Sequence, residues 1–167
     1  GLTPPTTLQH TTAANATQWT HSGLSPNTAY TMQVAATNTI VGLTSAPTTP
    51  YTAWTLANVP AAPTLANPTQ TTLDVTLNAD GNPIYTLYAL EVLPGVGGNT
   101  WVQADGSLGA AAVYQTVATW GTITVTGLTP STTYQVHALA QNGAGVDTAF
   151  GPAATEHTLA NVPAAPV

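Results

Sequence analysis

The nine residues TLANVPAAP occur twice in the chain, at 55–63 and again at 158–166. A longer block also recurs, because GLSPNTAYTMQVAATN at 23–38 resembles GLTPSTTYQVHALAQN at 127–142. The phrase is displaced by 103 residues (158 minus 55) and the block by 104 (127 minus 23), so one residue is gained or lost in a loop or bulge between them. Such a period is the size of a small domain and exceeds the roughly 20–50 residues of solenoid repeats. The repeat therefore predicts two copies of one folding unit.

Apolar residues alternate with polar ones along most of the chain, which is the period-two pattern of half-buried strands. The clearest stretches are TLDVTLNA at 72–79, YALEV at 88–92, TITVTGL at 122–128 and TYQVHALA at 133–140. Turn-forming residues lie between them, as in ADGN at 79–82, ADGS at 104–107 and NGAG at 142–145. Many short strands without helices predict an all-β sandwich.

The repeated block carries a motif, Gly-Leu-x-Pro-x-Thr-x-Tyr followed by alternating apolar residues and an Asn, that resembles the fibronectin type III domain. The resemblance implies tandem immunoglobulin-like sandwiches of a bacterial-type extracellular or cell-surface protein. It also implies that Leu24 and Leu128 end the fifth strand, and that Tyr30 and Tyr134 form tyrosine corners.

The chain departs from the family at the tryptophan of the second strand. Leu77 takes that place, and we expect Trp101 and Trp120 to fill part of the volume.

The two copies predicted by the repeat are not of equal length. We expect a partial domain at 1–56 with the C-terminal strands only, a proline-containing linker at 57–63, and a complete domain at 64–159. Residues 160–167 would form a second linker and the start of a further repeat. Half a sandwich exposes its core and its strand edges. Two readings stay open: the chain is a stretch of a longer array, or strands of another copy complete the open half.

The charges of the chain restrict its partners. There is no Lys, Arg or Cys, and the six charged residues are all acidic: Asp74, Asp80, Glu91, Asp105, Asp147 and Glu156. Nucleic acids and anionic membrane surfaces are bound through cations, so neither is an expected partner. No apolar stretch approaches about 20 residues, so no membrane insertion is expected. Without Lys or Arg the chain offers trypsin-like proteases no target, which is compatible with an extracellular or cell-surface location.

Candidate sites are few, and each has an ordinary structural explanation. Asn78, Asp80 and Asn82 could offer oxygen ligands to calcium, but they also form a turn and lack the distal glutamate of an EF-hand loop. Asp80 and Asp105 each precede glycine in an apparent turn, so a hydrolytic pair is not favoured. The four histidines are expected to be structural, and no cofactor is expected. Asn15 begins an Asn-x-Thr tripeptide and is a candidate for glycosylation.

Three functions remain compatible with these observations, and none is enzymatic. The first is a structural module that assembles with other copies of itself into a fibre, sheath, stalk or surface layer. The second is a carbohydrate- or surface-binding adhesion module that uses exposed aromatic rings, for which Trp54 is the best candidate. The third is a passive spacer in a larger secreted enzyme.

Overall fold

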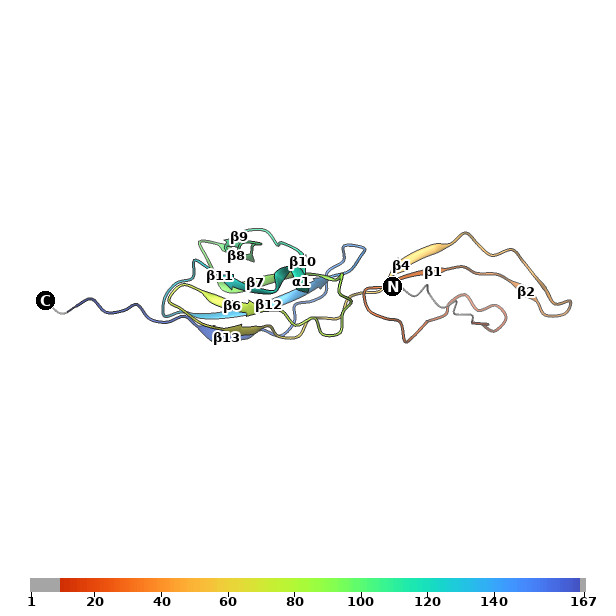
Figure 1. Ribbon diagram of the computed structural model, residues 1–167. Helices are drawn as coiled ribbons and strands as arrows, with labels where there is room; N and C mark the ends of the chain where they lie inside the picture. The colour runs from red at the N-terminus through yellow and green to blue at the C-terminus, as the bar shows by residue number, and fades with distance from the viewer. Residues whose placement is uncertain (1–9, 166–167) are drawn as a thin grey trace.

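The structure is a computed structural model that describes residues 10–165. Two bodies lie end to end, which gives the molecule an elongated shape (Figure 1). We call residues 57–159 the sandwich, because they contain β5 to β13, and residues 10–56 the half-sandwich, because they contain only β1 to β4.

The sandwich consists of two antiparallel sheets packed face to face. One sheet has the order β11-β6-β5. The other has the order β13-β12-β7-β8-β9, and β10 pairs with β7. The strands are β5 (Thr64–Ala66), β6 (Leu73–Thr76), β7 (Leu87–Val96), β8 (Asn99–Val102), β9 (Leu108–Gly109), β10 (Gln115–Thr116), β11 (Thr122–Val125), β12 (Thr133–Gln141) and β13 (Ala154–His157). The predicted all-β sandwich is confirmed.

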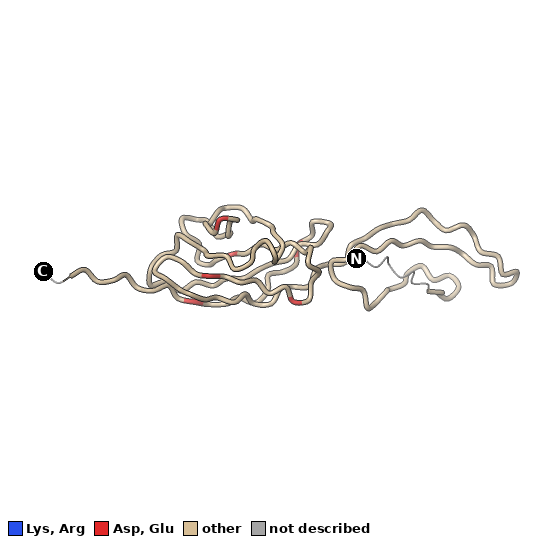
Figure 2. Tube along the Cα trace, viewed as in Figure 1, with Lys and Arg blue, Asp and Glu red and all other residues tan. Residues whose placement is uncertain are grey.

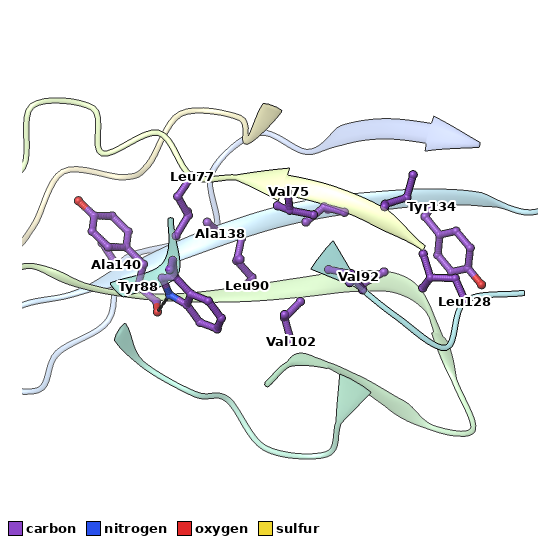
Figure 3. Packing of buried hydrophobic residues seen from close by; sticks show 14 of the residues in the cluster. Val75, Leu77, Tyr88, Leu90, Val92, Val102, Leu128, Tyr134, Ala138 and Ala140 are labelled. Atoms are coloured by element: carbon purple, nitrogen blue, oxygen red, sulfur yellow. Dashed lines mark hydrogen bonds between the residues drawn. The ribbon is translucent and has the colours of Figure 1, made fainter. Parts of the chain in front are cut away.

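The core lies between the two sheets and consists of the alternating apolar residues (Figure 3). The buried members include Leu73, Val75, Leu77, Tyr88, Leu90, Val92, Val125, Tyr134, Val136, Ala138 and Ala140. These are the residues that the period-two pattern placed on one face, apart from Ile123, which is partly buried against the cluster. The pattern therefore predicted both the strands and the side of each that faces inward.

A single helical turn interrupts the strands, which corrects the prediction of a chain without helices. It is α1 (Val117–Trp120), and it begins at Thr116, whose hydroxyl accepts a hydrogen bond from the backbone of Thr119. It ends at Gly121, which has a φ of 53°. The turn directs Trp120 into the core, where the indole N–H donates to the Tyr88 carbonyl at 2.9 Å.

Trp120 thus occupies the core as expected, whereas Trp101 does not. Trp101 lies directly opposite Glu91 in the β7–β8 pair, and directly opposite residues share a face of the sheet. Glu91 alternates with the buried Leu90 and Val92, so its face is the outer one. The expectation that Trp101 fills core volume was wrong.

The half-sandwich contains two short strand pairs. β1 (Ala29–Met32) pairs with β4 (Tyr51–Trp54), and β2 (Thr37–Asn38) pairs with β3 (Leu43–Thr44). Residues 17–22, which carry Trp19 and His21, form no strand. Their counterparts in the sandwich belong to β11, which pairs with β6. No counterpart of β6 lies among the described residues of the half-sandwich, so the segment lacks the partner that would make it a strand.

The same hydrogen bonds fix the corner of both copies. The Tyr30 hydroxyl accepts from the backbone N–H of Ser25 at 2.9 Å, and the Tyr134 hydroxyl accepts from that of Thr129 at 2.8 Å. Thr55 and Thr158 each return a side-chain hydrogen bond to the corner, at 2.8 and 2.7 Å. The two copies therefore share backbone geometry as well as sequence.

The structure also locates the one-residue difference between the copies. The backbone pairs Ala36 with Ser45 in the first copy and Ala140 with Thr148 in the second, each at 2.8 Å. The first loop thus spans 37–44 and the second spans 141–147, one residue fewer. The first loop is long enough to form β2 and β3, whereas the second closes around the Asn142 side chain. The expected insertion in a loop is confirmed.

Threonine pairs stabilise the strand pairs without charge. The hydroxyls of Thr31 and Thr52 lie 2.8 Å apart across β1 and β4, and those of Thr76 and Thr122 lie 2.8 Å apart across β6 and β11. Such cross-strand pairs contribute about 0.2–1 kcal/mol each. They explain how a chain with so few charges covers its outer surfaces with polar groups.

Candidate functional site: the joint and the open face

The half-sandwich is attached to the sandwich by a buried asparagine, Asn27, at the turn before β1. Its amide nitrogen donates to the Thr86 hydroxyl at 2.8 Å, and its amide oxygen accepts from the Gly143 backbone at 2.7 Å. Its backbone carbonyl accepts from the Tyr85 hydroxyl at 2.9 Å. Asn27 is 1% exposed, so these bonds are shielded from water. We call the contacts between the half-sandwich and the sandwich, with Asn27 among them, the joint.

Two further contacts complete the joint. The Asn142 amide donates to the Thr55 carbonyl at 3.0 Å. The Trp54 indole lies against Gly143, where a side-chain carbon would collide with the ring. Thr28, Ala29, Trp54 and Tyr85 line a shallow apolar pocket of about 370 Å³ beside it. Trp54, the tryptophan that the sequence marked as the best exposed candidate, is therefore part of the joint, although 38% of it stays exposed.

The linker that follows the half-sandwich is held along the end of the sandwich. The Asn82 side chain accepts from the Asn58 backbone N–H at 2.7 Å and donates to the Asn58 carbonyl at 2.9 Å. Pro60 is fully buried, and its carbonyl touches Gly151 where any side chain would collide. The linker at 57–63 is thus tied to the sandwich at two points.

The second occurrence of the repeated phrase has a different environment. Ala57 and Pro60 are buried in the first occurrence, whereas their counterparts Ala160 and Pro163 are exposed. The same letters therefore form a held linker at one end of the sandwich, whereas residues 159–165 are exposed at the other. The difference comes from what each copy contacts, since the sequence is the same.

The half-sandwich exposes an apolar face, whereas the corresponding face of the sandwich is buried. Met32 and Val34 are 51% and 69% exposed, whereas their counterparts Val136 and Ala138 are 1% and 0% exposed. Tyr51 pairs with Met32 across β4 and β1 and shares its face, and it is exposed too. We call Tyr30, Met32, Val34 and Tyr51 the open face. A group of exposed apolar side chains of this kind is a candidate interaction surface.

The joint residues were not recognised from the sequence. One signal was present, because Asn27 stands where the otherwise similar second copy has Ser131. Both residues have a positive φ, 42° and 52°. An asparagine amide donates from its nitrogen and accepts at its oxygen, and Asn27 does both across the joint, whereas Ser131 is exposed.

The candidate calcium ligands take part in other contacts. The Asn78 side chain accepts from the backbone N–H of Asp80 at 3.1 Å, and the Asn82 side chain holds the linker. Within residues 10–165, no group of three or more His, Cys, Asp or Glu side chains could hold a metal ion. Calcium binding there stays a prediction. Asp80 and Asp105 lie in separate turns, and the Ser107 hydroxyl lowers the pKa of Asp105 below its usual value.

An aromatic cluster covers part of the outer face of the larger sheet. The rings of His137 and Phe150 are stacked with centroids 4.0 Å apart, and Phe150 also stacks on Trp101 at 5.9 Å. The His137 ring lies 2.8 Å from the Glu91 carboxylate. Phe150 has one stacked neighbour on β12 and another on β8, so much of the ring surface is occupied within the protein.

The other predicted positions lie at the surface. His10 and His21 both contact the Trp19 ring, with centroids 4.1 and 4.8 Å apart. His157 bonds the Thr133 hydroxyl across β13 and β12. Asn15 lies in an exposed turn with a φ of 64°, and its glycosylation stays a prediction.

Tyr114 is expected to ionise well above the ordinary tyrosine pKa. Desolvation, together with its hydrogen bond to the Asp147 carboxylate at 2.8 Å, raises the pKa of Tyr114 to about 12. The fold therefore favours the neutral phenol, and this contribution to stability is fully present below about pH 10 and is lost as the pH rises through about 12. In an absorbance titration of tyrosinate, Tyr114→Phe should remove a step near pH 12. A titration curve that loses a step near pH 10 instead would contradict this.

Within the described residues, no helix is both long and apolar enough to span a membrane. No protein-family model matches the chain, and no curated protein matches it. Among solved structures, domains d3–d4 of the rat CD45 extracellular region are similar, with a TM-score of 0.48 and 18% identity over 92% of this chain and 75% of that one.

Two single domains are similar as well. The fn3 domain of human collagen alpha-1(XX) has a TM-score of 0.45 and 23% identity over 66% of this chain and 91% of that one. A fibronectin type III domain of human fibronectin type III domain containing protein 3 has a TM-score of 0.45 and 20% identity over 63% and 88%.

Proposed function

We propose that this protein is a non-enzymatic extracellular structural module that builds a fibre, sheath, stalk or surface layer. Sandwiches stack end to end within it, and strands of different copies complement one another. The observation that carries the proposal is the joint, in which Asn27 is buried and bonded to three groups of the sandwich. A passive flexible linker needs no such contact.

A rigid joint has a mechanical consequence. Proline-containing linkers are semi-rigid spacers, and here the linker is also hydrogen-bonded through Asn58 and packed against Gly151 through Pro60. Tandem units held at a defined angle transmit force and keep their spacing, which is what a stalk or fibre requires. The elongated arrangement in Figure 1 agrees with such a role.

The non-enzymatic part of the proposal rests on how the reactive side chains are used. The acidic and histidine side chains that come together, such as Glu91 with His137 or Asp147 with Tyr114, lie on surfaces and not in a deep pocket. The extracellular part rests on composition, since a chain without Lys or Arg offers trypsin-like proteases no site.

Carbohydrate binding is a second candidate, favoured by the outer-face cluster of Trp101, His137 and Phe150. Phe150 is 39% exposed and could stack on a sugar ring. We place this function second, because the rings stack on one another and Trp54 belongs to the joint.

The structural function predicts assembly. In light scattering over a range of concentrations, the mass of the purified chain should rise above the 16.9 kDa of one copy, and electron microscopy should show elongated particles. Monomers at every concentration would contradict the assembly proposal.

A further inference from the structure

We infer that Asn142 is a site of spontaneous deamidation, that the joint keeps it unreactive, and that its modification stops an opened joint from closing again. Asn142 is followed by Gly143, and this is the only Asn-Gly pair in the sequence. Asparagine deamidates fastest before glycine, because a residue without a side chain lets the backbone nitrogen approach the asparagine amide closely. The inference goes beyond the proposed structural function and does not depend on it.

The reaction needs water and no other reagent. The backbone nitrogen of Gly143 loses its proton to solvent and attacks the side-chain carbonyl carbon of Asn142. A C–N bond forms, and the side-chain amide nitrogen takes up a proton and leaves as ammonia. Water then opens the cyclic imide at either of its carbonyl carbons, which leaves aspartate or isoaspartate at this position.

The half-sandwich holds both nitrogens that react. The Gly143 N–H, which must be free to attack, donates to the Asn27 amide oxygen at 2.7 Å. The Asn142 amide nitrogen, which must leave, donates to the Thr55 carbonyl at 3.0 Å. The Trp54 ring lies against Gly143 as well. The closed joint therefore withholds the attacking nitrogen and the leaving nitrogen together.

The amide oxygen of Asn142, in contrast, is held by its own loop. It accepts from the backbone N–H groups of Ala144 at 3.0 Å and Val146 at 2.9 Å. These bonds do not cross the joint, so they do not depend on its being closed. When the joint opens, the two nitrogens lose their partners and water reaches a side chain that is 4% exposed in the closed state.

The product of deamidation does not fit the closed joint. At neutral pH its carboxylate has no N–H to donate, so it would meet the Thr55 carbonyl oxygen against oxygen. A buried charge is costly unless it is paired. The half-sandwich has no charged residue, and the whole chain has no Lys or Arg to neutralise the new carboxylate (Figure 2). Deamidation therefore turns a reversible opening of the joint into a permanent one.

The first test measures the deamidation rate of Asn142 in the full chain, from the mass of the peptide that contains it after incubation in neutral buffer. Asn27→Ala should raise the rate by more than about 10-fold, because the joint opens more often without two of its bonds. Trp54→Ala, which uncovers Gly143 and lies outside the core cluster, should raise it as well. Ser131→Ala, at the corresponding corner of the sandwich, should change it by less than about threefold.

Urea provides the reference for an unguarded site. In urea that unfolds the chain, the unmodified protein and the three variants should deamidate at one common rate, because the joint is absent from all of them. The folded, unmodified chain should be slower than this reference by more than about 10-fold. A folded chain that deamidates as fast as the unfolded one, or equal rates for Asn27→Ala and Ser131→Ala in buffer, would overturn the inference.

The second test places the product in the chain. Asn142→Asp keeps an oxygen for the N–H groups of Ala144 and Val146 and loses the donor to Thr55. Asn38→Asp is the matched control, because Asn38 is the exposed counterpart of Asn142 and also accepts from the backbone of its own loop. In small-angle X-ray scattering, Asn142→Asp should broaden the distance distribution and Asn38→Asp should leave it unchanged. Equal profiles for the two variants would overturn the inference, whereas assembly measured by light scattering tests the proposed function separately.

Discussion

Replacing Trp120 with alanine is expected to lower the free energy of unfolding of the sandwich by about 3–5 kcal/mol. The side chain is 4% exposed and belongs to the same core cluster as Tyr88, Leu90 and Val102. Its removal leaves a cavity and deprives the Tyr88 carbonyl of the indole N–H at 2.9 Å. Because single domains are stable by only about 5–15 kcal/mol, the loss is a large part of the total.

The matched control is Trp101→Ala, which removes the same side chain from the outer face. It loses the stacking contact with Phe150 and should cost about 1 kcal/mol. The two variants can be compared by denaturant unfolding, and the melting temperature of Trp120→Ala should fall by on the order of 20 °C. Similar losses for the two tryptophans would show that Trp101 contributes to the core as much as Trp120 does.

Replacing Asn27 with alanine is expected to release the half-sandwich from the sandwich while the sandwich stays folded. The substitution leaves the Thr86 hydroxyl and the Gly143 N–H without their partners, and each buried group left unpaired costs about 1–3 kcal/mol. The Tyr85 hydroxyl donates to the backbone carbonyl of Asn27, so the substitution does not remove this bond directly. The half-sandwich should therefore adopt a range of angles to the sandwich in place of one angle. This range broadens the distance distribution in small-angle X-ray scattering.

Ser131→Ala is the control for backbone strain. Ser131 stands at the corresponding position of the second copy and has a similar positive φ, where alanine is disfavoured by about 1–2 kcal/mol. It makes no contact across the joint, so its scattering profile should match that of the unmodified chain. An Asn27→Ala profile that also matches would show that the joint does not depend on these bonds.

Much of the fold could be predicted from local pattern. The alternation of Leu73, Val75 and Leu77 on one strand and of Tyr134, Val136 and Ala138 on another predicted which side chains are buried, because a strand places every second residue on the same face. The turns at Asp80 and Asn142 were visible in the same way. The helical turn at 117–120 was not, since four residues are too few for a periodic signal and its cap is a single threonine.

The candidate site was less visible in the sequence. Asn27 is an ordinary turn residue by its local pattern, and its partners Thr86 and Gly143 lie 59 and 116 positions from it (86 minus 27 and 143 minus 27). No local rule connects residues so far apart. The difference between Asn27 and Ser131 in two otherwise similar blocks was the one available sign that the two corners have different neighbours.

The sequence by itself determined the β architecture, the repeat of the corner motif and the neutral charge of the half-sandwich, because each depends on residue type and on spacing along the chain. The tertiary structure alone decided the fate of residues that are locally alike. It buried Trp120 and left Trp101 outside, and it buried Ala57 and Pro60 of the first TLANVPAAP while leaving Ala160 and Pro163 of the second exposed. It also left the Trp19 segment without strand structure although its counterpart is β11. The reason is physical: burial and strand pairing are properties of a contact, and a contact requires the partner as well as the residue.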